Sequence, residues 1–568
     1  MHLPENPQEL LTWTWAQFEP LYAALNQTAL TAENLETWLH DWSHLDEAAV
    51  ELENRLYVAI TQDTGDQASE ARFNLFIEEV QPKIHAAAQA LKEKLLASAL
   101  PVPDGLDLAV ERMRTEAALF REENLPLITQ EQKLSNAYAK KLSEQSVVWD
   151  GEERTLSQMT PFLLKPIRMH RELAWRRMNK RRLEDRAALN ELWVSLYTLR
   201  REIAQNAGLD NFRDYRWRQL HRSDYTPQDC LSFHEAIADA VVPAATRIYE
   251  RRRKLFGYET LRPWDLDADP LNRAPLAPFE THEQLTAGTA AIFNQVDPVL
   301  GGYFKTMIDQ KLIDLDNRKG KAPGGYCTEF PYSRLPFIFT NAVGLHDDVQ
   351  TLLHEGGHCF HTFESSRLPY YPQTQVTNEF AEVASMGMEL LAAPYLEKSN
   401  GGFYTPQDAA RAQIEHLEGM ILFWPYMSVV DSFQHWAYTH PNEGGQPARC
   451  DEIWTELWQR FMPGIDYRGL EDVRATGWHN KLHIFQLPFY YIEYGLAQLG
   501  AAQVWSNSLT DPAGALADYR KALALGGTRR LPDLFRAAGA QLAFDRATLA
   551  AAVEKIEARI TQLEAIAA

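Results

Sequence analysis

Two histidines four residues apart, His354 and His358, constrain this chain more than any other feature of its sequence. In a helix, such residues share one face with about 5–6 Å between their Cβ atoms, so both imidazoles can bind one metal ion. Glu355 lies one residue further round, poorly placed as a ligand but well placed as a general base for water. Residues 345–363 contain no proline and carry apolar residues at helical spacing. We therefore predict a metal-binding helix here; the alternative is a helix with histidines on a solvated face.

A catalytic zinc ion needs a third protein ligand and an open position. His361 follows His354 by seven residues, about 10 Å along a straight helix, which is too far to share the ion, so we expect it to border the site. In the segment 378–391, Glu379, Glu382 and Glu389 fall on one face of an otherwise apolar helix. Buried carboxylates require a cation or hydrogen bonds. The spacing of these residues does not show whether Glu379 or Glu382 is the third metal ligand.

The order His-Glu-Gly-Gly-His-Cys-Phe-His over residues 354–361, followed by Phe-Ala-Glu-Val-Ala-Ser over residues 380–385, resembles the thimet oligopeptidase and oligoendopeptidase F family of zinc metallopeptidases. The resemblance is greatest to the bacterial oligoendopeptidase branch and covers nearly the whole chain. It implies that His354, His358 and Glu382 bind one Zn²⁺ per chain and that Glu389 is a partner of these ligands. It also implies cleavage of internal bonds in short oligopeptides. Position 356 departs from the family, because glycine replaces a bulky apolar residue.

One histidine and three tyrosines lie within residues 482–495. Imidazole and hydroxyl donors suit the stabilisation of an oxyanion, although an aromatic stretch of this kind more often packs in a core. The family resemblance assigns His483, Tyr491 and Tyr494 to the region of the scissile carbonyl. Tyr490 remains an alternative to Tyr491.

The periodicity of apolar residues predicts helices over most of the chain. Strand patterns occur at residues 321–328 and 335–341, directly before the metal-binding helix, and an edge strand there can pair with a peptide backbone. Residues 257–283, rich in proline and aspartate, predict an extended connection with one buried tryptophan. We expect a mostly α, two-lobed zincin-type fold with a small β-sheet beside the zinc helix and a deep substrate channel. The expected division is residues 1–186 and 187–568.

Composition excludes some partners. A formal net charge of −21 argues against nucleic acid or an anionic membrane as a general partner. The basic stripe at residues 168–186 is expected to be a solvated helix face, paired with Glu172, Glu184 and Asp185. The four cysteines lack CxxC spacing, which favours a reducing compartment. The first residues do not resemble a secretory signal, and the apolar stretch at 420–430 is too short to span a bilayer. The expected location is cytoplasmic.

The sequence thus predicts a zinc metalloendopeptidase that acts on oligopeptides. Two alternatives stay open: a zinc carboxypeptidase of similar helical architecture, and a non-catalytic helical scaffold with a structural zinc ion or none. The presence of Glu355 beside the histidines, and of three rather than four candidate ligands, argues against the scaffold. Neither the peptide preference nor the oligomeric state is predicted.

Overall fold

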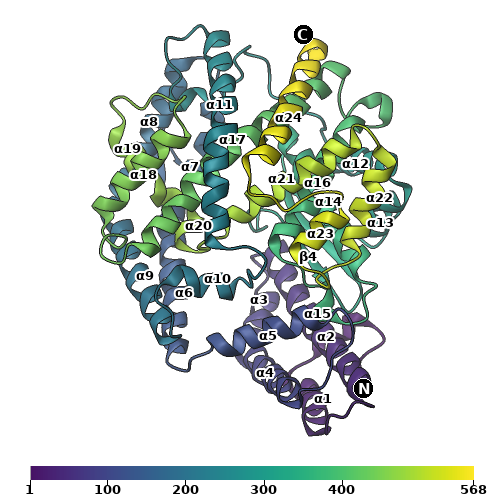
Figure 1. Cartoon of the computed structure of the whole chain (residues 1–568). Coiled ribbons are helices and arrows are strands. Elements are labelled where there is room, and N and C mark those ends of the chain that lie inside the picture. The colour runs from purple at the N-terminus through teal and green to yellow at the C-terminus, as the bar shows by residue number, and fades with distance from the viewer. Residues whose placement is uncertain (1, 568) are drawn as a thin grey trace.

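Helices dominate the structure, a computed structural model that describes residues 2–567. The predicted mostly α fold is confirmed. The first helices form a group beneath the rest of the molecule (Figure 1). Their apolar side chains, from Leu10 to Val110, make a separate core that also includes Tyr370. The group consists of α1 (Trp15–Gln27), α2 (Leu35–Gln62), α3 (Gln67–Leu75), α4 (Gln81–Ser98) and α5 (Asp107–Leu119).

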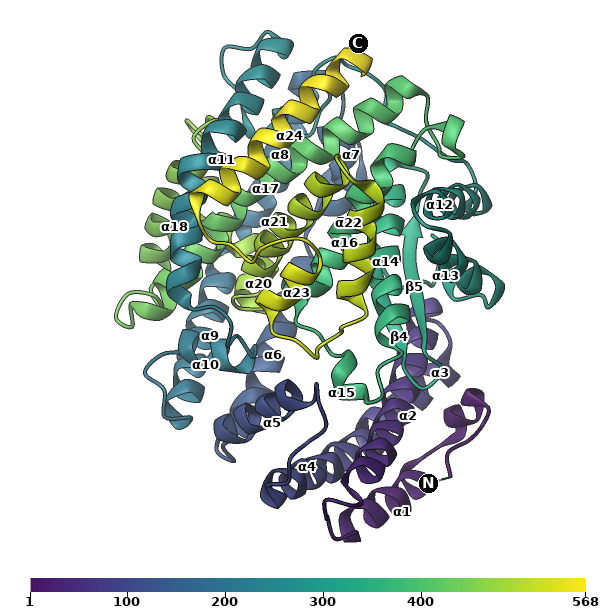
Figure 2. The same cartoon turned by 45° about the vertical axis from the view of Figure 1, so that its right-hand side comes forward.

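The larger body above this group has one extended apolar core. Helix α24 crosses α11 and α17 on its surface (Figure 2). Within residues 2–567, every helix is too short or too polar to pass through a lipid bilayer. The helices of this body are α6 (Asn124–Ser143), α7 (Leu156–Leu163), α8 (Arg168–Glu184), α9 (Arg186–Asn206), α10 (Phe212–Gln219), α11 (Pro227–Phe256), α12 (His282–Val296), α13 (Pro298–Asp309), α14 (His346–Ser365), α15 (Tyr371–Thr374), α16 (Asn378–Ala392), α17 (Pro406–Thr439), α18 (Pro447–Phe461), α19 (Glu471–Ala475), α20 (Leu482–Phe485), α21 (Tyr491–Ser508), α22 (Pro512–Leu523), α23 (Leu531–Ala537) and α24 (Arg546–Ala567).

A three-stranded sheet lies beside α14 (Figure 2). Its order is β3 (Ile313–Asp316), β5 (Leu335–Ala342), β4 (Tyr326–Phe330), with β3 parallel and β4 antiparallel to the central β5. The two strands predicted before the metal-binding helix are therefore confirmed, and β4 is an edge strand. Strand β3 and a separate hairpin of β1 (Ser146–Trp149) and β2 (Glu152–Thr155) were not predicted from the sequence.

Helices α2 and α5 of the lower group form hydrogen bonds with the edge strand β4 and with the segment before α16. Asn54 on α2 donates a hydrogen bond of 2.8 Å to the carbonyl of Glu329 on β4. Arg112 on α5 donates one of 2.6 Å to the carbonyl of Gln375. The two parts of the molecule therefore meet where the chain approaches α14 and α16.

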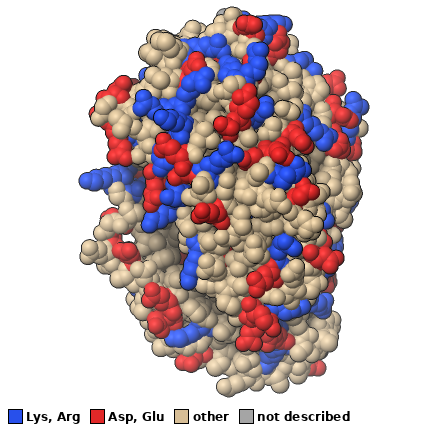
Figure 3. Space-filling model, turned by 90° about the vertical axis from the view of Figure 1, so that its left-hand side faces the viewer, with Lys and Arg blue, Asp and Glu red and all other residues tan. Residues whose placement is uncertain are grey.

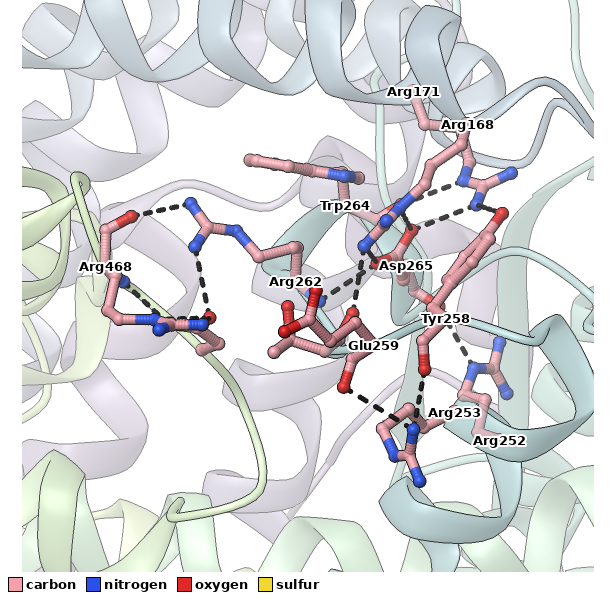
Figure 4. Close-up of polar contacts among 12 residues, drawn as sticks. Arg168, Arg171, Arg252, Arg253, Tyr258, Glu259, Arg262, Trp264, Asp265 and Arg468 are labelled. Atoms are coloured by element: carbon pink, nitrogen blue, oxygen red, sulfur yellow. Dashed lines mark hydrogen bonds and ion pairs between the residues drawn. The ribbon is translucent and has the colours of Figure 1, made fainter.

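The proline-rich segment 257–283 is an irregular connection, as predicted, with a short 3₁₀ turn at Pro263–Asp265. Asp265 is fully buried and accepts hydrogen bonds from two arginines of α8 (Figure 4). Its carboxylate lies 2.6 Å from Arg168 Nη2 and 3.0 Å from Arg171 Nη2. The side chain of Arg171 is itself fully buried. Asp265 therefore fixes the connection to α8.

The expectation of a solvated basic stripe is only partly right. Arg176 pairs with Glu172 at 2.8 Å, and Arg181 pairs with Asp185 at 2.8 Å and lies 3.8 Å from Glu184. Arg171, by contrast, faces inward because a buried carboxylate 94 residues further along the chain neutralises it. On the face in Figure 3, basic and acidic side chains are interspersed.

Replacing Asp265 with alanine is expected to lower the free energy of unfolding by about 3–5 kcal/mol, because Arg171 then remains buried without a counter-charge. Urea denaturation followed by circular dichroism measures the loss. Glu172→Ala, which breaks an exposed pair on the same helix, is the control and should change stability far less. Equal effects of the two substitutions would show that Asp265 does not anchor α8.

Candidate active site

Helices α14 and α16 bring two histidines and one glutamate together. The rings of His354 and His358 have centroids 5.0 Å apart. Glu382 Oε2 lies 3.3 Å from His354 Nε2 and 3.8 Å from His358 Nε2. Around a tetrahedral zinc ion with bonds of about 2.0–2.1 Å, neighbouring donors are about 3.4 Å apart. The three donor atoms therefore fit one zinc ion.

Two glycines in α14 set how closely its neighbours approach. A Cβ atom on Gly357 would lie 2.5 Å from the carbonyl oxygen of Ala384 and 2.6 Å from Ser385 Cα, so only glycine allows α14 and α16 to touch here. A Cβ atom on Gly356 would lie 2.4 Å from Cζ of Phe293. The ring of Phe293, on α12, fills the space that a larger residue at position 356 would need.

Further side chains hold the three donors in place. Glu389 Oε1 lies 2.6 Å from His354 Nδ1, while its Oε2 lies 3.4 Å from His416 Nδ1. Ser385 donates a hydrogen bond of 2.9 Å to Glu382 Oε2. Burial works against protonation of His354, but its hydrogen bonds to Glu382 and Glu389 outweigh burial and raise its pKa well above the usual value. Partners of this kind fix ring orientation and increase ligand basicity.

The contact of His416 with Glu389 and the role of Ser385 were not predicted from the sequence. Ser385 had a local signal, because it follows Glu382 by three residues on the same helix face. His416 lies on α17, and nothing near it in the sequence indicates contact with Glu389.

Glu379, the other candidate acid, has different partners. Tyr225 donates a hydrogen bond of 2.5 Å to Glu379 Oε1, and Arg222 Nε lies 3.5 Å from the same oxygen. Arg222 also donates to Glu493 at 2.5 Å. Glu379 is thus part of a buried ion-pair cluster, and Glu382 is the acid that faces the histidines.

Glu355 lies between the histidines and the edge strand. It is 9% exposed, and burial raises its pKa to about 7. A hydrogen bond from the backbone of Cys327, on β4, opposes this rise. The edge strand therefore passes directly beside the carboxylate.

His361 and Cys359, which also lie on α14, are buried. His361 is 5% exposed and packs against Phe380, with ring centroids 6.0 Å apart. The group of donors that could share a metal ion includes His354, His358 and Glu382, and His361 is outside it. Cys359 is fully buried, and its Sγ lies 3.5 Å from Cys327 Sγ. Both are free thiols.

His483, on α20, stands among the three tyrosines. Its ring centroid is 4.8 Å from that of Tyr491, 5.9 Å from Tyr490 and 6.1 Å from Tyr494. Burial, assisted by the charge of Lys481, lowers the pKa of His483 to about 4. The imidazole is therefore neutral at pH 7 and has one N–H to donate.

The tyrosines differ in what they face. Burial raises the pKa of both Tyr490 and Tyr494, and the charge of Glu382 raises each further. Their rings are 5.2 Å apart. The ring of Tyr491 instead contacts Phe423 at 5.4 Å, and Lys481 Nζ lies 3.8 Å from its centroid. Because the charge of Glu382 acts on Tyr490 and Tyr494, we favour Tyr490, the alternative left open by the sequence, as the neighbour of Tyr494 toward the metal-binding residues.

The chain is similar to known protein families and to curated proteins. Residues 162–554 match the profile of "Peptidase family M3", and residues 12–101 match "Peptidase M3 N-terminal domain". Oligopeptidase PepF of Bacillus subtilis (strain 168) is 21% identical over 327 residues, covering 57% of this chain and 47% of the relative. An oligoendopeptidase F homolog of Borreliella burgdorferi is 22% identical over 335 residues, covering 57% and 54%. The chain thus spans about half the length of the curated relatives it matches.

Solved structures match over nearly the full length of both chains. PZ peptidase A, determined with an inhibitor, has a TM-score of 0.84 and 28% identity, with 99% of this chain and 98% of that one covered. A putative oligoendopeptidase F has a TM-score of 0.84 and 27% identity, with 100% and 99% covered.

Proposed function

Because the chain belongs to peptidase family M3, we propose that it is a zinc-dependent endopeptidase that hydrolyses internal bonds of short oligopeptides. The observation that carries the proposal is the group of three donors, His354, His358 and Glu382, with Glu355 beside it. Three protein ligands leave a position open for water or substrate, as catalytic zinc sites require.

Each of the candidate residues has its own role in the proposed reaction. Zinc held by His354, His358 and Glu382 would supply a Lewis acid that polarises the scissile carbonyl and lowers the pKa of water. Glu355 removes a proton from the attacking water and returns it to the leaving amine. His483 and Tyr494 donate hydrogen bonds to the oxyanion that develops on the carbonyl oxygen.

The edge strand β4 orients the substrate. An extended peptide that adds to β4 forms main-chain hydrogen bonds, which depend little on its sequence. Because the backbone of Cys327 already contacts Glu355, a peptide on this strand passes the general base. Helices α1–α5 are attached to β4 through Asn54, and in this proposal they and the larger helical body wall a channel that admits only extended chains. A folded domain cannot present such a chain.

A mixed peptide digest analysed by mass spectrometry tests the proposal. The expected products are internal fragments of short peptides, formed without a chelator and absent with one. A native protein in the same mixture should stay intact, whereas its unfolded fragments should be cut. Stepwise loss of C-terminal residues would identify a carboxypeptidase instead. Absence of any cleavage by the zinc-loaded chain would favour the non-catalytic scaffold.

Removing the hydroxyl of Tyr494 is expected to lower kcat by about 10²–10³-fold with much less effect on KM, because an oxyanion donor acts only in the transition state. Steady-state kinetics of Tyr494→Phe measures this, and His483→Ala should behave similarly. Tyr490→Phe and Tyr491→Phe form a matched pair: the first should lower kcat and the second should leave it nearly unchanged. The reverse order would restore Tyr491 to the role that the family resemblance implies.

A further inference from the structure

A second group of metal-ligating side chains lies between α11 and α17, two helices that pack along each other. Cys230 and His234 are four residues apart on α11, and Asp431 and His435 are four apart on α17. Donor atoms of Cys230, Asp431 and His435 all lie within 4.8 Å of one another. The donor atoms of His354, His358 and Glu382 also all lie within 4.8 Å of one another. The two groups share no residue.

This group is sealed from solvent. Cys230 and Asp431 are 0% exposed, His234 is 2% exposed and His435 is 3% exposed. The rings of Trp217 and Phe489 pack on His435, with centroids 5.8 Å and 5.3 Å away. Polar atoms in such surroundings need partners, since an unpaired buried polar group is costly.

Several of the buried polar atoms have no hydrogen-bond partner. Both ring nitrogens of His435 and Oδ1 of Asp431 are unsatisfied. His435 Nε2 lies 3.3 Å from Asp431 Oδ2, close enough to share an ion but without hydrogen-bond geometry. Buried side-chain atoms of this kind are rarely left unpaired in a native protein. An ion among them would satisfy a nitrogen and the free carboxylate oxygen together.

His234 orients the carboxylate rather than competing for the ion. Its Nε2 lies 2.9 Å from Asp431 Oδ2, and its Nδ1 lies 2.9 Å from the hydroxyl of Ser432. A neutral imidazole that donates to Asp431 and accepts from Ser432 satisfies both ring nitrogens. Hydrogen-bonded partners of this type hold ligands in place at metal sites.

We propose that Cys230, Asp431 and His435 bind a second divalent transition-metal ion, best matched by zinc, which joins α11 to α17 inside the helical body and whose fourth position is filled by a buried water molecule. Thiolate, carboxylate and imidazole are all zinc ligands, and the thiolate disfavours calcium or magnesium. One thiolate and one carboxylate neutralise the two charges of the ion, so the buried group becomes electrically neutral. Burial, and after it the charge of Asp431, raise the pKa of the Cys230 thiol well above its usual value. A bound cation would offset that effect by stabilising the thiolate.

Cobalt distinguishes this site from the active site without reference to activity. A cobalt(II) ion bound by a thiolate has a near-ultraviolet charge-transfer band, whereas an ion bound only by histidine and glutamate has none. The full chain is produced in cobalt-supplemented minimal medium, so that the metal is present while the buried site forms. We expect this band and two metal equivalents per chain. In Glu382→Ala, one equivalent and the full band should remain.

Cys230→Ser is expected to abolish the band and lower the metal content by one equivalent. Cys450→Ser is the matched control, because Cys450 is also 0% exposed but its thiol contacts the carbonyl of Gly444. It should retain the band. His435→Gln, which keeps Cys230, tests the site if Cys230→Ser fails to fold, and should lose the second equivalent. One equivalent in the unmodified chain with no band, or a band that survives Cys230→Ser, would overturn the proposal.

Discussion

Glutamine at position 355 leaves the zinc content unchanged and lowers kcat by at least about 10²–10⁴-fold, the contribution typical of a general base. The amide keeps the shape of the side chain and can still accept the hydrogen bond from the Cys327 backbone. It cannot take a proton from water. Metal analysis and steady-state kinetics on the same preparation separate the two effects.

Glu364→Gln is the matched control for this substitution. It makes the same chemical change on the same helix, at a buried carboxylate that pairs with Arg520 at 2.8 Å rather than with the histidines. Its kcat should stay close to that of the unmodified chain. A zinc-replete Glu355→Gln variant with normal turnover would remove Glu355 from the mechanism.

Alanine at position 382 should cause the largest loss of metal from the active site. Glu382 Oε2 lies within 3.8 Å of Nε2 of both histidines, so its removal leaves two ligands. The loss of a hydrogen-bonded partner of a ligand, such as Glu389, typically lowers metal affinity by about 10–100-fold. We expect Glu382→Ala to lower zinc affinity by more than that. Competition with a chromogenic chelator measures the affinity of Glu382→Ala and Glu389→Gln.

His361→Ala is the comparison for the metal measurement. Its ring packs against Phe380, outside the group of donors, so the variant should keep most of its zinc. If His361→Ala loses the metal and Glu382→Ala keeps it, the third ligand has been assigned to the wrong residue.

Local spacing was enough to predict the helices that carry the candidate site. The positions of His354 and His358 and the acidic face of residues 378–391 both follow from the helical repeat. Spacing could not separate Glu379 from Glu382, because the difference lies in Arg222 and Tyr225, more than 150 residues earlier in the chain. Family resemblance supplied the choice that local sequence did not.

The unpredicted elements had weaker or longer-range signals. Asp150 and Gly151 form the turn of the β1–β2 hairpin, and both have positive φ, 53° and 85°. An Asp-Gly pair is a recognised hairpin turn, but the residues that follow it, Glu152–Thr155, are all polar, so the strand signal beside this turn is weak. The burial of Asp265 could not be predicted from the sequence, because it depends on arginines of α8 nearly a hundred residues away. Long-range charge pairing leaves no local pattern.

The two largest apolar cores of the described residues imply an order of folding. The lower core draws all its members but Tyr370 from residues 10–110, so its contacts are short in sequence and form quickly. The helices of the metal-binding residues depend on later chain, because the hydroxyl of Tyr519 on α22 donates to the carbonyl of Ala384 on α16. We expect amides of α2 to gain protection before those of α16 in pulsed hydrogen exchange during refolding. The group of helices α1–α5 would then be complete before the helices that carry the candidate metal ligands.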